Sequence, residues 1–380
     1  MTNQDAESLK ECREMVRDFA RAEIGPHVRE WDDKAVFPRD VFRRLGELGL
    51  MGILIPEEHG GAGMTYRHYV AVLEELGAVE GGIALSVAAH NSLCTNHIYT
   101  YGSEDVRRAW LARLAKGEVL GAWGLTEPEA GSDSGATKTT AVREGDGWVI
   151  NGNKNFITHA GVGGVAVVMT RTKPGTDHRG ISAFAVPLDA PGVTVGKHED
   201  KVGMRVSDTA SLIFEGCRVG AEALLGREGE GFIQAMEILD GGRISIAALS
   251  VGIARGALDA AVAYAKERRQ FGKPLAAFQA IRFKLADMAT DVQAARLLTE
   301  RAAEDKDAGR KTTLLSSQAK LYASEAAVRV AENAVQILGG YGYCKDYPVE
   351  KFWRDAKLCT IGEGTSEIQR LVIAREVIGE

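Results

Sequence analysis

Val165-Ala166-Val167-Val168-Met169 and Ser182-Ala183-Phe184-Ala185-Val186 decide the fold of the middle of this chain. Both runs are short, apolar and bounded by polar residues, which is the pattern of buried strands. Ala210, Leu212 and Phe214 then alternate with outward-facing residues, as in a half-buried strand. Because no helical period separates these strands, the pattern favours an antiparallel sheet or a small barrel over β-α-β units.

Both flanks of this β region have the period of helices. Towards the N-terminus, Leu9, Cys12 and Val16 recur at helical spacing. Towards the C-terminus, three long helical segments are predicted at about 230–266, 277–306 and 312–338, with a last helix after Glu363. Four long helices with short connections indicate an antiparallel bundle.

The sequence therefore predicts an α+β chain of three domains. An N-terminal α-helical domain spans 1–120, a middle antiparallel β-sheet or barrel domain spans 121–228, and a C-terminal four-helix bundle spans 229–380. Within the middle domain, Gly147-Trp148-Val149-Ile150-Asn151-Gly152 is predicted as a strand entering a hairpin turn.

Composition excludes several classes of protein. Of the 380 residues, 45% are hydrophobic and 26% charged, as in an ordinary globular protein. The net charge of −6 and the lack of a basic run argue against nucleic acid as a partner. Five scattered cysteines fit reduced thiols. We expect no membrane span and, since acidic residues fill the N-terminus, no transit peptide, so the predicted location is the cytoplasm.

Several common catalytic patterns are absent from the sequence. There is no G-x-G-x-x-G after a strand, no P-loop, no H-E-x-x-H and no G-x-S-x-G. A nicotinamide dehydrogenase of the doubly wound type is therefore disfavoured. His90 and His97 lie two helical turns apart without a further ligand at metal spacing, so we predict packing roles and no metal site.

The stretch Ile361-Gly362-Glu363-Gly364-Thr365-Ser366-Glu367-Ile368-Gln369-Arg370 carries one carboxylate between two glycines. Ser366 and Gln369 fit a capping box, and Ile368, Leu371, Val372 and Ile378 form an apolar stripe after it. The free N–H groups of the first helical turn favour a negative group nearby. On this pattern alone, a solvated turn before a capped helix is equally open.

This segment resembles the C-terminal signature of the acyl-CoA dehydrogenase family, in which the glutamate of Glu-Gly-Thr removes the α-proton of the substrate. The resemblance runs from the first helix to the last residues and includes five motifs in the family's order. It implies the family's three-domain fold, an FAD cofactor and an acyl-CoA substrate, with Glu363 as the catalytic base.

Two motifs of the middle domain resemble the family's flavin site. Trp123-Gly124-Leu125-Thr126-Glu127-Pro128-Glu129-Ala130-Gly131-Ser132-Asp133 resembles T-E-P-x-A-G-S-D, which implies that Thr126 bonds the flavin and that Ser132 touches flavin or CoA. In Asn151–His159, Phe156 takes the place of an aromatic residue, often tryptophan, that packs on the flavin, and Thr158 would lie near N5. The residues alone also allow a structural turn and a core phenylalanine.

In the first long bundle helix, the resemblance puts Arg243 beside the substrate. Some members of the family carry their base immediately before this arginine. This chain has Gly242 there, which returns that role to Glu363. Without the resemblance, Arg243 could be an ordinary surface charge.

Two further motifs imply that FAD is shared between subunits. Arg268-Arg269-Gln270-Phe271-Gly272 resembles a segment that reaches the FAD of a neighbour, with the arginine on the pyrophosphate. Gln336-Ile337-Leu338-Gly339-Gly340 resembles the segment that covers its adenine side. The family's usual assembly is a homotetramer, a dimer of dimers.

The full prediction carries these roles over by position. The predicted cofactor-binding residues are Trp123, Leu125, Thr126, Ser132, Phe156, Ile157, Thr158, Arg268, Phe271, Gln279, Gln336, Gly339, Gly340, Thr365 and Glu367. The predicted substrate-binding residues are Ser132, Asp240, Arg243, Gly364 and Arg375. The implied reaction is α,β-desaturation of a fatty acyl-CoA, of the short-chain type, with the β-hydride passing to flavin N5 and electrons to an electron-transferring flavoprotein. The alternatives are an acyl-CoA oxidase that uses oxygen and a non-catalytic CoA-ester-binding flavoprotein.

Overall fold

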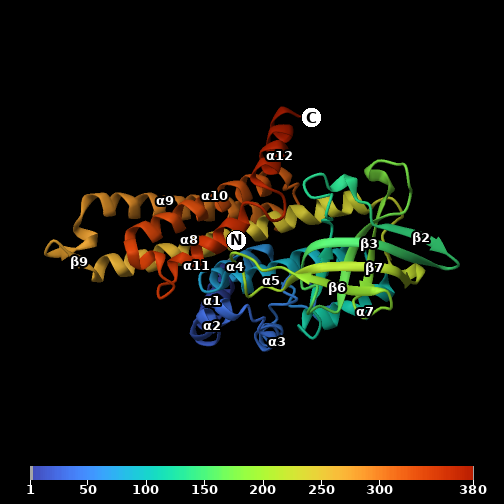
Figure 1. The fold of residues 1–380 in the computed structure, drawn as a ribbon, viewed down its shortest axis with the longest axis horizontal. Helices are drawn as coiled ribbons and strands as arrows, with labels where there is room; N and C mark the ends of the chain where they lie inside the picture. Colours follow the sequence, from blue (N-terminus) through green and yellow to red (C-terminus); the bar gives the residue numbers. More distant parts are fainter. Residues whose placement is uncertain (1–2, 380) are drawn as a thin grey trace.

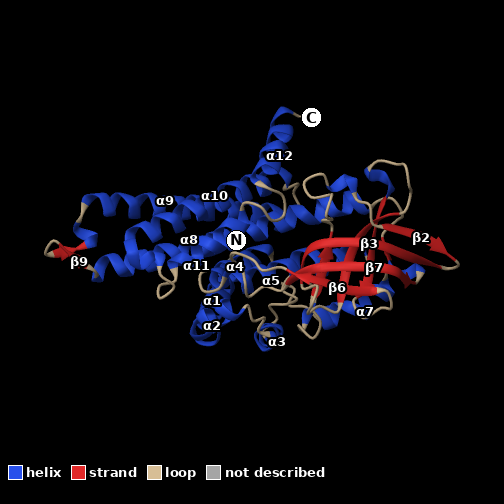
Figure 2. Cartoon of the chain, viewed as in Figure 1, coloured by secondary structure: helices blue, strands red, loops and turns tan. Residues whose placement is uncertain are grey.

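The computed structural model describes residues 3–379 and has the predicted order of helices, sheet and helices (Figure 1). Figure 2 shows the large sheet at one end of the long axis, and the long helices extending to the other end, where only one short pair of strands lies. The N-terminal helices are α1 (Asn3–Phe19), α2 (Val28–Lys34), α3 (Arg39–Glu47), α4 (Tyr66–Gly77), α5 (Gly81–Ala88), α6 (Asn96–Tyr101) and α7 (Glu104–Ala115). In Figure 1, α1, α2 and α3 lie below the long helices, and α7 lies below the sheet. Side-chain caps mark the starts of two of them: the Glu80 carboxylate accepts a hydrogen bond from Gly82 N at α5, and the Ser103 hydroxyl accepts one from Val106 N at α7.

The middle domain is an eight-stranded mixed sheet. Its strands are β1 (Gly121–Gly124), β2 (Thr140–Glu144), β3 (Gly147–Thr158), β4 (Val165–Arg171), β5 (Ile181–Pro187), β6 (Val193–His198), β7 (Thr209–Val219) and β8 (Leu224–Leu225). The order is β6-β7-β3-β2-β4-β5-β8, with β1 also on β4. The prediction of a purely antiparallel sheet was wrong, because β4 runs parallel to both β1 and β2. The hairpin of β2 and β3 lies between β1 and β4 in the sequence, and this longer excursion returns the chain in the same direction.

The predicted hairpin turn at Asn151-Gly152 was also wrong. Strand β3 continues through both residues, and the turn lies one strand earlier, where Glu144 pairs with Gly147 around Gly145. Gly152 instead lies at an irregularity in the pairing of β3 with β7. Its φ of 141° and the Cα of Thr139, 2.6 Å from where a Cβ would lie, leave room for glycine only. The same composition that makes hairpin turns therefore lies within a strand here, where Asn151 is opposite two residues of β7, Glu215 and Gly216.

The C-terminal domain is built on α8 (Gly231–Glu267), α9 (Gln279–Asp307) and α10 (Thr313–Leu338). The short hairpin of β9 (Arg269–Gln270) and β10 (Lys273–Pro274) joins α8 to α9. Within residues 3–379, α8 alone is long and apolar enough to cross a membrane by length and composition, but 67% of its apolar window is buried inside the protein. It is the central helix of the bundle, packed against α4, α9 and α10.

The fourth member of the bundle is not the helix that was predicted. The missed helix α11 (Val349–Cys359) packs against both α8 and α10, whereas α12 (Ser366–Ile378) packs on α10 and projects from the bundle (Figure 1). The predicted apolar stripe of α12 is largely uncovered in one chain, since Leu371 is 66% and Ile378 69% exposed. Its buried residues are Ser366 and Gln369, which face the Glu363 turn.

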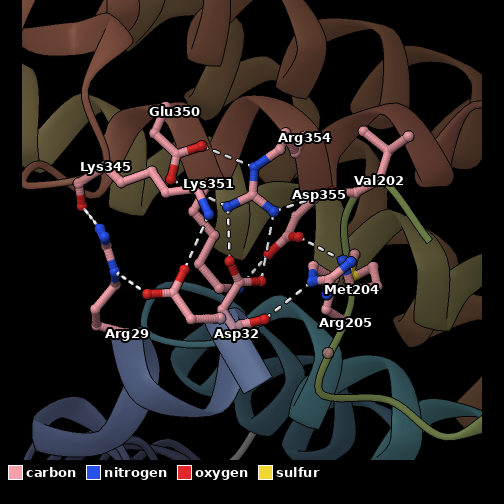
Figure 3. A network of polar contacts seen from close by, with 12 residues as sticks. Arg29, Asp32, Val202, Met204, Arg205, Lys345, Glu350, Lys351, Arg354 and Asp355 are labelled. Carbon is pink, nitrogen blue, oxygen red and sulfur yellow. Dashed lines mark hydrogen bonds and ion pairs between the residues drawn. The ribbon is translucent and has the colours of Figure 1, made fainter. Parts of the chain in front are cut away.

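Buried charges join the three domains at one junction (Figure 3). Lys351 Nζ donates to Asp355 Oδ2 at 2.6 Å and to Glu80 Oε1 at 2.7 Å, and Asp355 Oδ1 accepts a bond from Met204 N at 2.6 Å. Arg354 donates to Asp32 Oδ2 at 2.7 Å. We call this group the three-domain junction; its members are Asp32, Glu80, Met204, Lys351, Arg354 and Asp355. It fixes α11, and therefore the chain leading to Glu363, to both other domains.

Three buried histidines lie where the N-terminal helices meet the sheet. His90 bonds Leu114 O and accepts from Gly121 N, His97 bonds Gln234 and accepts from Trp123 Nε1, and His159 bonds Gly121 O. These bonds fit the predicted packing roles. Within residues 3–379, no group of three or more His, Cys, Asp or Glu residues could hold a metal ion.

Burial of these histidines predicts sensitivity to acid. Burial lowers the pKa of His90 to about 3 and those of His97 and His159 to about 4. The unfolded chain, with histidine pKa values near 6.5, therefore binds more protons below that pH, and stability falls as the pH drops from about 6.5 towards 4. At pH 5 each histidine costs roughly 2 kcal/mol.

Urea unfolding at pH 7.5 and pH 5 checks this expectation with two matched variants. His159→Gln keeps an amide donor but cannot be protonated, so the loss of stability between the two pH values should be smaller than in the parent protein. His27→Gln, at an exposed position, should leave that loss unchanged. Equal losses in all three proteins would show that the burial of His159 does not contribute to the acid response.

Candidate active site

Glu363 sits on a strained turn between α11 and α12. Its φ is 54° and that of Gly364 is 93°, both in the left-handed region. A left-handed glutamate costs of order 1 kcal/mol or more and persists where its surroundings hold it. Here Gln369 Nε2 donates to the carbonyl oxygens of Glu363 and Gly364, at 3.3 and 3.0 Å. The helix cap is Thr365, whose hydroxyl accepts from Ile368 N, so the predicted capping box of Ser366 and Gln369 was wrong.

The carboxylate of Glu363 is aimed inward without a partner. Its Oε2 is buried and makes no hydrogen bond to any residue that the structure describes. Burial raises the pKa of Glu363 to about 7, partly offset by the positive charges of Lys320 and Arg243. A carboxylate whose pKa lies near neutral pH, in a partly apolar site, is suited to take a proton from carbon.

Gly242 makes room for this carboxylate. A Cβ on residue 242 would lie 3.0 Å from Glu363 Cδ and closer still to Oε2, so no side chain fits there while Glu363 points inward. The helix α8 runs without a break through Gly241 and Gly242, so these glycines permit close approach without interrupting the helix. A side chain at position 242 and an inward-pointing Glu363 carboxylate therefore exclude each other in this chain.

Arg243 is buried, which excludes the surface-charge alternative. It is 5% exposed, and its Nη1 donates to Asp240 Oδ1 at 2.6 Å. The other oxygen of Asp240 accepts from the Thr313 hydroxyl at 2.7 Å, which ties the arginine to the start of α10. Arg243 Nε is buried and has no partner among the described residues. Burial lowers the pKa of Arg243, and the positive charge of Arg375 on α12 lowers it further.

Sequence reasoning missed Lys320 on α10. This lysine is fully buried, and its Nζ donates to Gly364 O at 2.6 Å. Burial lowers its pKa to about 8. A lysine inside a helical stripe of small residues was the one local signal that could have found it.

On the sheet side, Phe156 presents an exposed ring. Its φ is 58° and it is 65% exposed, so it is not part of the sheet core. Ile157 beside it is buried, and Thr158 pairs with Thr209 of β7. A flat apolar ring with a hydroxyl two residues away fits a flat heterocycle such as a flavin.

A buried ion pair shapes the loop that follows β1. Lys154 Nζ donates to Glu127 Oε1 at 2.7 Å and to Leu125 O at 3.2 Å, and Glu127 also accepts from the backbone N–H groups of Lys138 and Thr139. Asn155 N bonds Thr126 O, which brings the loop beside Phe156. Predicted residues Trp123, Leu125, Thr126, Phe156, Ile157 and Thr158 are therefore brought together, with Ser132 exposed at the loop end.

Five of the remaining predicted cofactor residues line two separate hollows. One, of about 330 Å³, is bounded by α10, α11 and the start of α12 and includes Thr365 and Glu367 with Lys357 and Arg329. The other, of about 440 Å³, lies at the far end of the bundle and includes Arg268, Gly339 and Gly340. A Cβ on either glycine would meet nothing within 4 Å, so both face open space that a ligand could fill. Basic residues, free N–H groups and an aromatic platform fit a dinucleotide such as FAD.

The predicted cofactor residues around Phe156 and those around Arg268 are far apart in one chain. Arg243 and Arg268 are separated by roughly 37 Å along α8, at about 1.5 Å per residue. Figure 1 shows the β9–β10 hairpin at the opposite end of the molecule from the sheet. Predicted residues Phe271 and Gln279 lie at this far end, as does Gln336 at the end of α10. Phe271 is 92% exposed. One chain therefore does not bring the two groups together.

The three domains match three family models in order. Residues 6–118 match the N-terminal domain of acyl-CoA dehydrogenase, residues 122–217 the middle domain and residues 229–378 the C-terminal domain. The chain belongs to the acyl-CoA dehydrogenase family. This membership makes it an oxidoreductase that acts on acyl-CoA and confirms FAD, the cofactor predicted from the sequence.

Individual relatives match over nearly the whole chain. The short-chain specific acyl-CoA dehydrogenase of Clostridium acetobutylicum is 47% identical over 96% of this chain and 96% of its own length. The structure of butyryl-CoA dehydrogenase from Megasphaera elsdenii is 41% identical, with a TM-score of 0.96 over 100% of this chain and 99% of that one. A chain in a structure of the electron transferring flavoprotein of Acidaminococcus fermentans is 44% identical, with a TM-score of 0.97 over 100% and 99%.

Proposed function

We propose that this acyl-CoA dehydrogenase desaturates short-chain acyl-CoA thioesters to trans-2-enoyl-CoA, with Glu363 as the base. The observation that carries the proposal is the buried, unpartnered Oε2 of Glu363, held on a left-handed turn against Gly242. Burial raises the pKa of this carboxyl to about 7, which matches a base that works near neutrality. The relatives of short-chain and butyryl-CoA type support the substrate class.

In the proposed reaction, Glu363 takes the α-proton of the bound thioester. Negative charge then develops on the thioester oxygen and needs a donor. The backbone N–H of Glu363 makes no hydrogen bond to a described residue and is free to serve. Bound FAD would supply the acceptor for the β-hydride. Closure of the site around the substrate excludes water and keeps the carboxylate basic.

Arg243 and Asp240 are the proposed substrate-binding residues on α8. Their ion pair, anchored by Thr313, leaves Arg243 Nε without a partner, and this donor is available to a substrate oxygen. Arg375 on α12 and Ser132 at the end of the β1 loop would hold the CoA portion, with Gly364 beside the thioester.

FAD would be held by the two groups of residues described above. Trp123, Leu125, Thr126, Ser132, Phe156, Ile157 and Thr158 would hold the flavin end, with Thr365 and Glu367 from the first hollow. Arg268, Phe271, Gln279, Gln336, Gly339 and Gly340 of a second copy would hold the rest. The separation of the groups along α8 supports a site shared by two chains. We extend this to a homotetramer, for which the exposed apolar residues of α12 offer a contact surface.

Complementation between two defective variants tests the shared site. Arg268→Ala should lower the FAD content, because it removes the charge on the pyrophosphate of the neighbouring chain. Glu363→Gln should retain FAD but not turn over. A mixed oligomer co-expressed from both should regain activity, since one of its sites combines the intact Glu363 of one chain with the intact Arg268 of the other. Activity no higher than that of either parent would argue for FAD held within one chain.

We further propose that electrons pass to an electron-transferring flavoprotein and that the enzyme serves fatty acid β-oxidation in the cytoplasm. The relative from the electron transferring flavoprotein structure supports the acceptor. Free cysteines, four of the five buried, support a reducing compartment. The proposed domain limits remain 1–120, 121–228 and 229–380.

Anaerobic absorbance titration with butyryl-CoA, then with longer and branched acyl-CoAs, tests the function. We expect an oxidised flavin spectrum that bleaches with butyryl-CoA. A flavin that none of these acyl-CoAs bleaches would overturn the proposed substrate class. A protein that holds no flavin after reconstitution with FAD would overturn the proposed enzymatic function. Oxygen consumption during turnover would favour the oxidase alternative.

A further inference from the structure

A buried lysine lies against the turn that carries Glu363. Lys320 is fully buried in the first third of α10, and its Nζ donates to Gly364 O at 2.6 Å. Among residues 3–379, no carboxylate oxygen lies within ion-pair distance of this ammonium group. Buried charges in proteins are normally paired, because an isolated one is costly. Lys320 therefore lacks the direct ion pair that usually accompanies a buried charge.

Glu363 is an acidic residue that supplies a negative charge near Lys320. Burial raises the pKa of Glu363 and lowers the pKa of Lys320. The charge of each residue opposes this effect of burial on the other. The neighbouring elements add other polar and charged groups around the pair, namely Arg243 and Asp240 on α8, Tyr69 on α4, Cys359 on α11, and Glu367 and Arg375 on α12. Arg243 is already engaged by Asp240, whereas Lys320 bonds only a neutral carbonyl.

The bond of Lys320 also acts on the backbone of the turn. Gly364 O accepts from both Lys320 Nζ and Gln369 Nε2. Rotation of the peptide after Gly364 would break both bonds, and that peptide closes the left-handed pair of Glu363 and Gly364. Two donors on one carbonyl therefore hold Glu363 in a conformation that a glutamate does not prefer.

We propose that Lys320 is a positioning residue for Glu363, holding its turn through Gly364 O and keeping its carboxylate ionised through a buried positive charge. This inference rests on the proposed role of Glu363 as the base. Burial alone would push the pKa of Glu363 above its value of about 7, and Lys320 is the first of the groups that pull it down. A higher pKa would make Glu363 a stronger base but would leave less of it ionised at a given pH. Lys320 limits this pKa and so increases the fraction of enzyme whose Glu363 is ionised.

Two variants separate the two effects. Lys320→Met removes both the charge and the donor, whereas Lys320→Gln removes the charge and keeps an amide donor. The matched control is Lys284→Gln, since Lys284 Nζ likewise donates to a single neutral oxygen, Asn333 Oδ1 at 2.8 Å, but on the α9 side of the bundle. Infrared titration of the resting holoenzyme follows the protonated carboxyl band that Glu363→Gln abolishes.

We expect the midpoint of that band to rise by about one pH unit in both Lys320 variants, a tenfold smaller ionised fraction at a given acidic pH. The acidic limb of kcat/KM should move with it, and Lys284→Gln should move neither. At high pH, Lys320→Gln should keep more of the parental kcat than Lys320→Met, because its amide can still hold the turn.

Unmoved midpoints in both variants, or an equal shift in Lys284→Gln, would overturn the inference. If Lys320→Met does not fold, the midpoint of Lys320→Gln decides. A shifted band in a protein that oxidises no acyl-CoA would leave the positioning role standing and remove the proposed function. Oxidation of acyl-CoA with an unshifted band would remove the positioning role alone.

Discussion

Replacement of Glu363 by glutamine is expected to lower kcat by roughly 10²- to 10⁴-fold, the range contributed by a general base. The amide has nearly the same shape and still fits against Gly242, so FAD content and acyl-CoA binding should persist. In the parent enzyme, kcat/KM should rise with pH as a group of pKa about 7 loses its proton. In the variant, this limb should vanish, because no carboxyl remains to titrate.

Stopped-flow reduction of the flavin by butyryl-CoA between pH 5.5 and 9 measures both effects. Glu47→Gln makes the same chemical change at the exposed end of α3 and should match the parent protein. Near-parental reduction by Glu363→Gln would move the base to another residue. A lost spectrum of bound flavin would mean that the substitution disrupted the site instead of the chemistry.

Replacement of Lys351 by methionine is expected to destabilise the protein by roughly 3–5 kcal/mol, the cost of removing one partner from a buried ion pair. The substitution leaves Glu80 and Asp355, both with fully buried side chains, without their shared cation. Burial opposes the charge of Lys351, but the two carboxylates more than offset this and raise its pKa. The loss should fall on the three-domain junction (Figure 3) and loosen α11.

Urea unfolding of the holoenzyme, with hydrogen exchange of α11, measures this loss. Lys34→Met is a close control, since Lys34 also pairs with an acid four residues away, Glu30 at 2.7 Å, but in solvent. Exposed pairs contribute about 0–1 kcal/mol, so this variant should be nearly neutral. Similar losses for the two variants would mean that the junction carboxylates are hydrated or neutral in the folded protein.

The local elements of the fold could be predicted from the sequence, because each depends on neighbouring residues. Periods of 3.6 and 2 located the long helices and the strands β4, β5 and β7. Two of the failures concern local motifs that allow more than one structure. Asn151-Gly152 suits both a hairpin turn and an irregular strand, and only the pairing of β3 with β7 selects the strand. Thr365 and Ser366 can both cap a helix, and the left-handed turn before them selects Thr365.

By itself the sequence determined the order of the domains, the carboxylate between two glycines, and, through five ordered motifs, the family. The tertiary structure alone decided which distant residues meet. Gly242 accommodates the carboxylate of Glu363, Lys320 holds the following carbonyl, and Lys351 joins Glu80 to Asp355. The tertiary structure also decided that the apolar stripe of α12 is largely exposed in one chain. Periodicity reports that a face is apolar or polar, but which surface covers it depends on packing between segments far apart in the chain, and no local pattern encodes that.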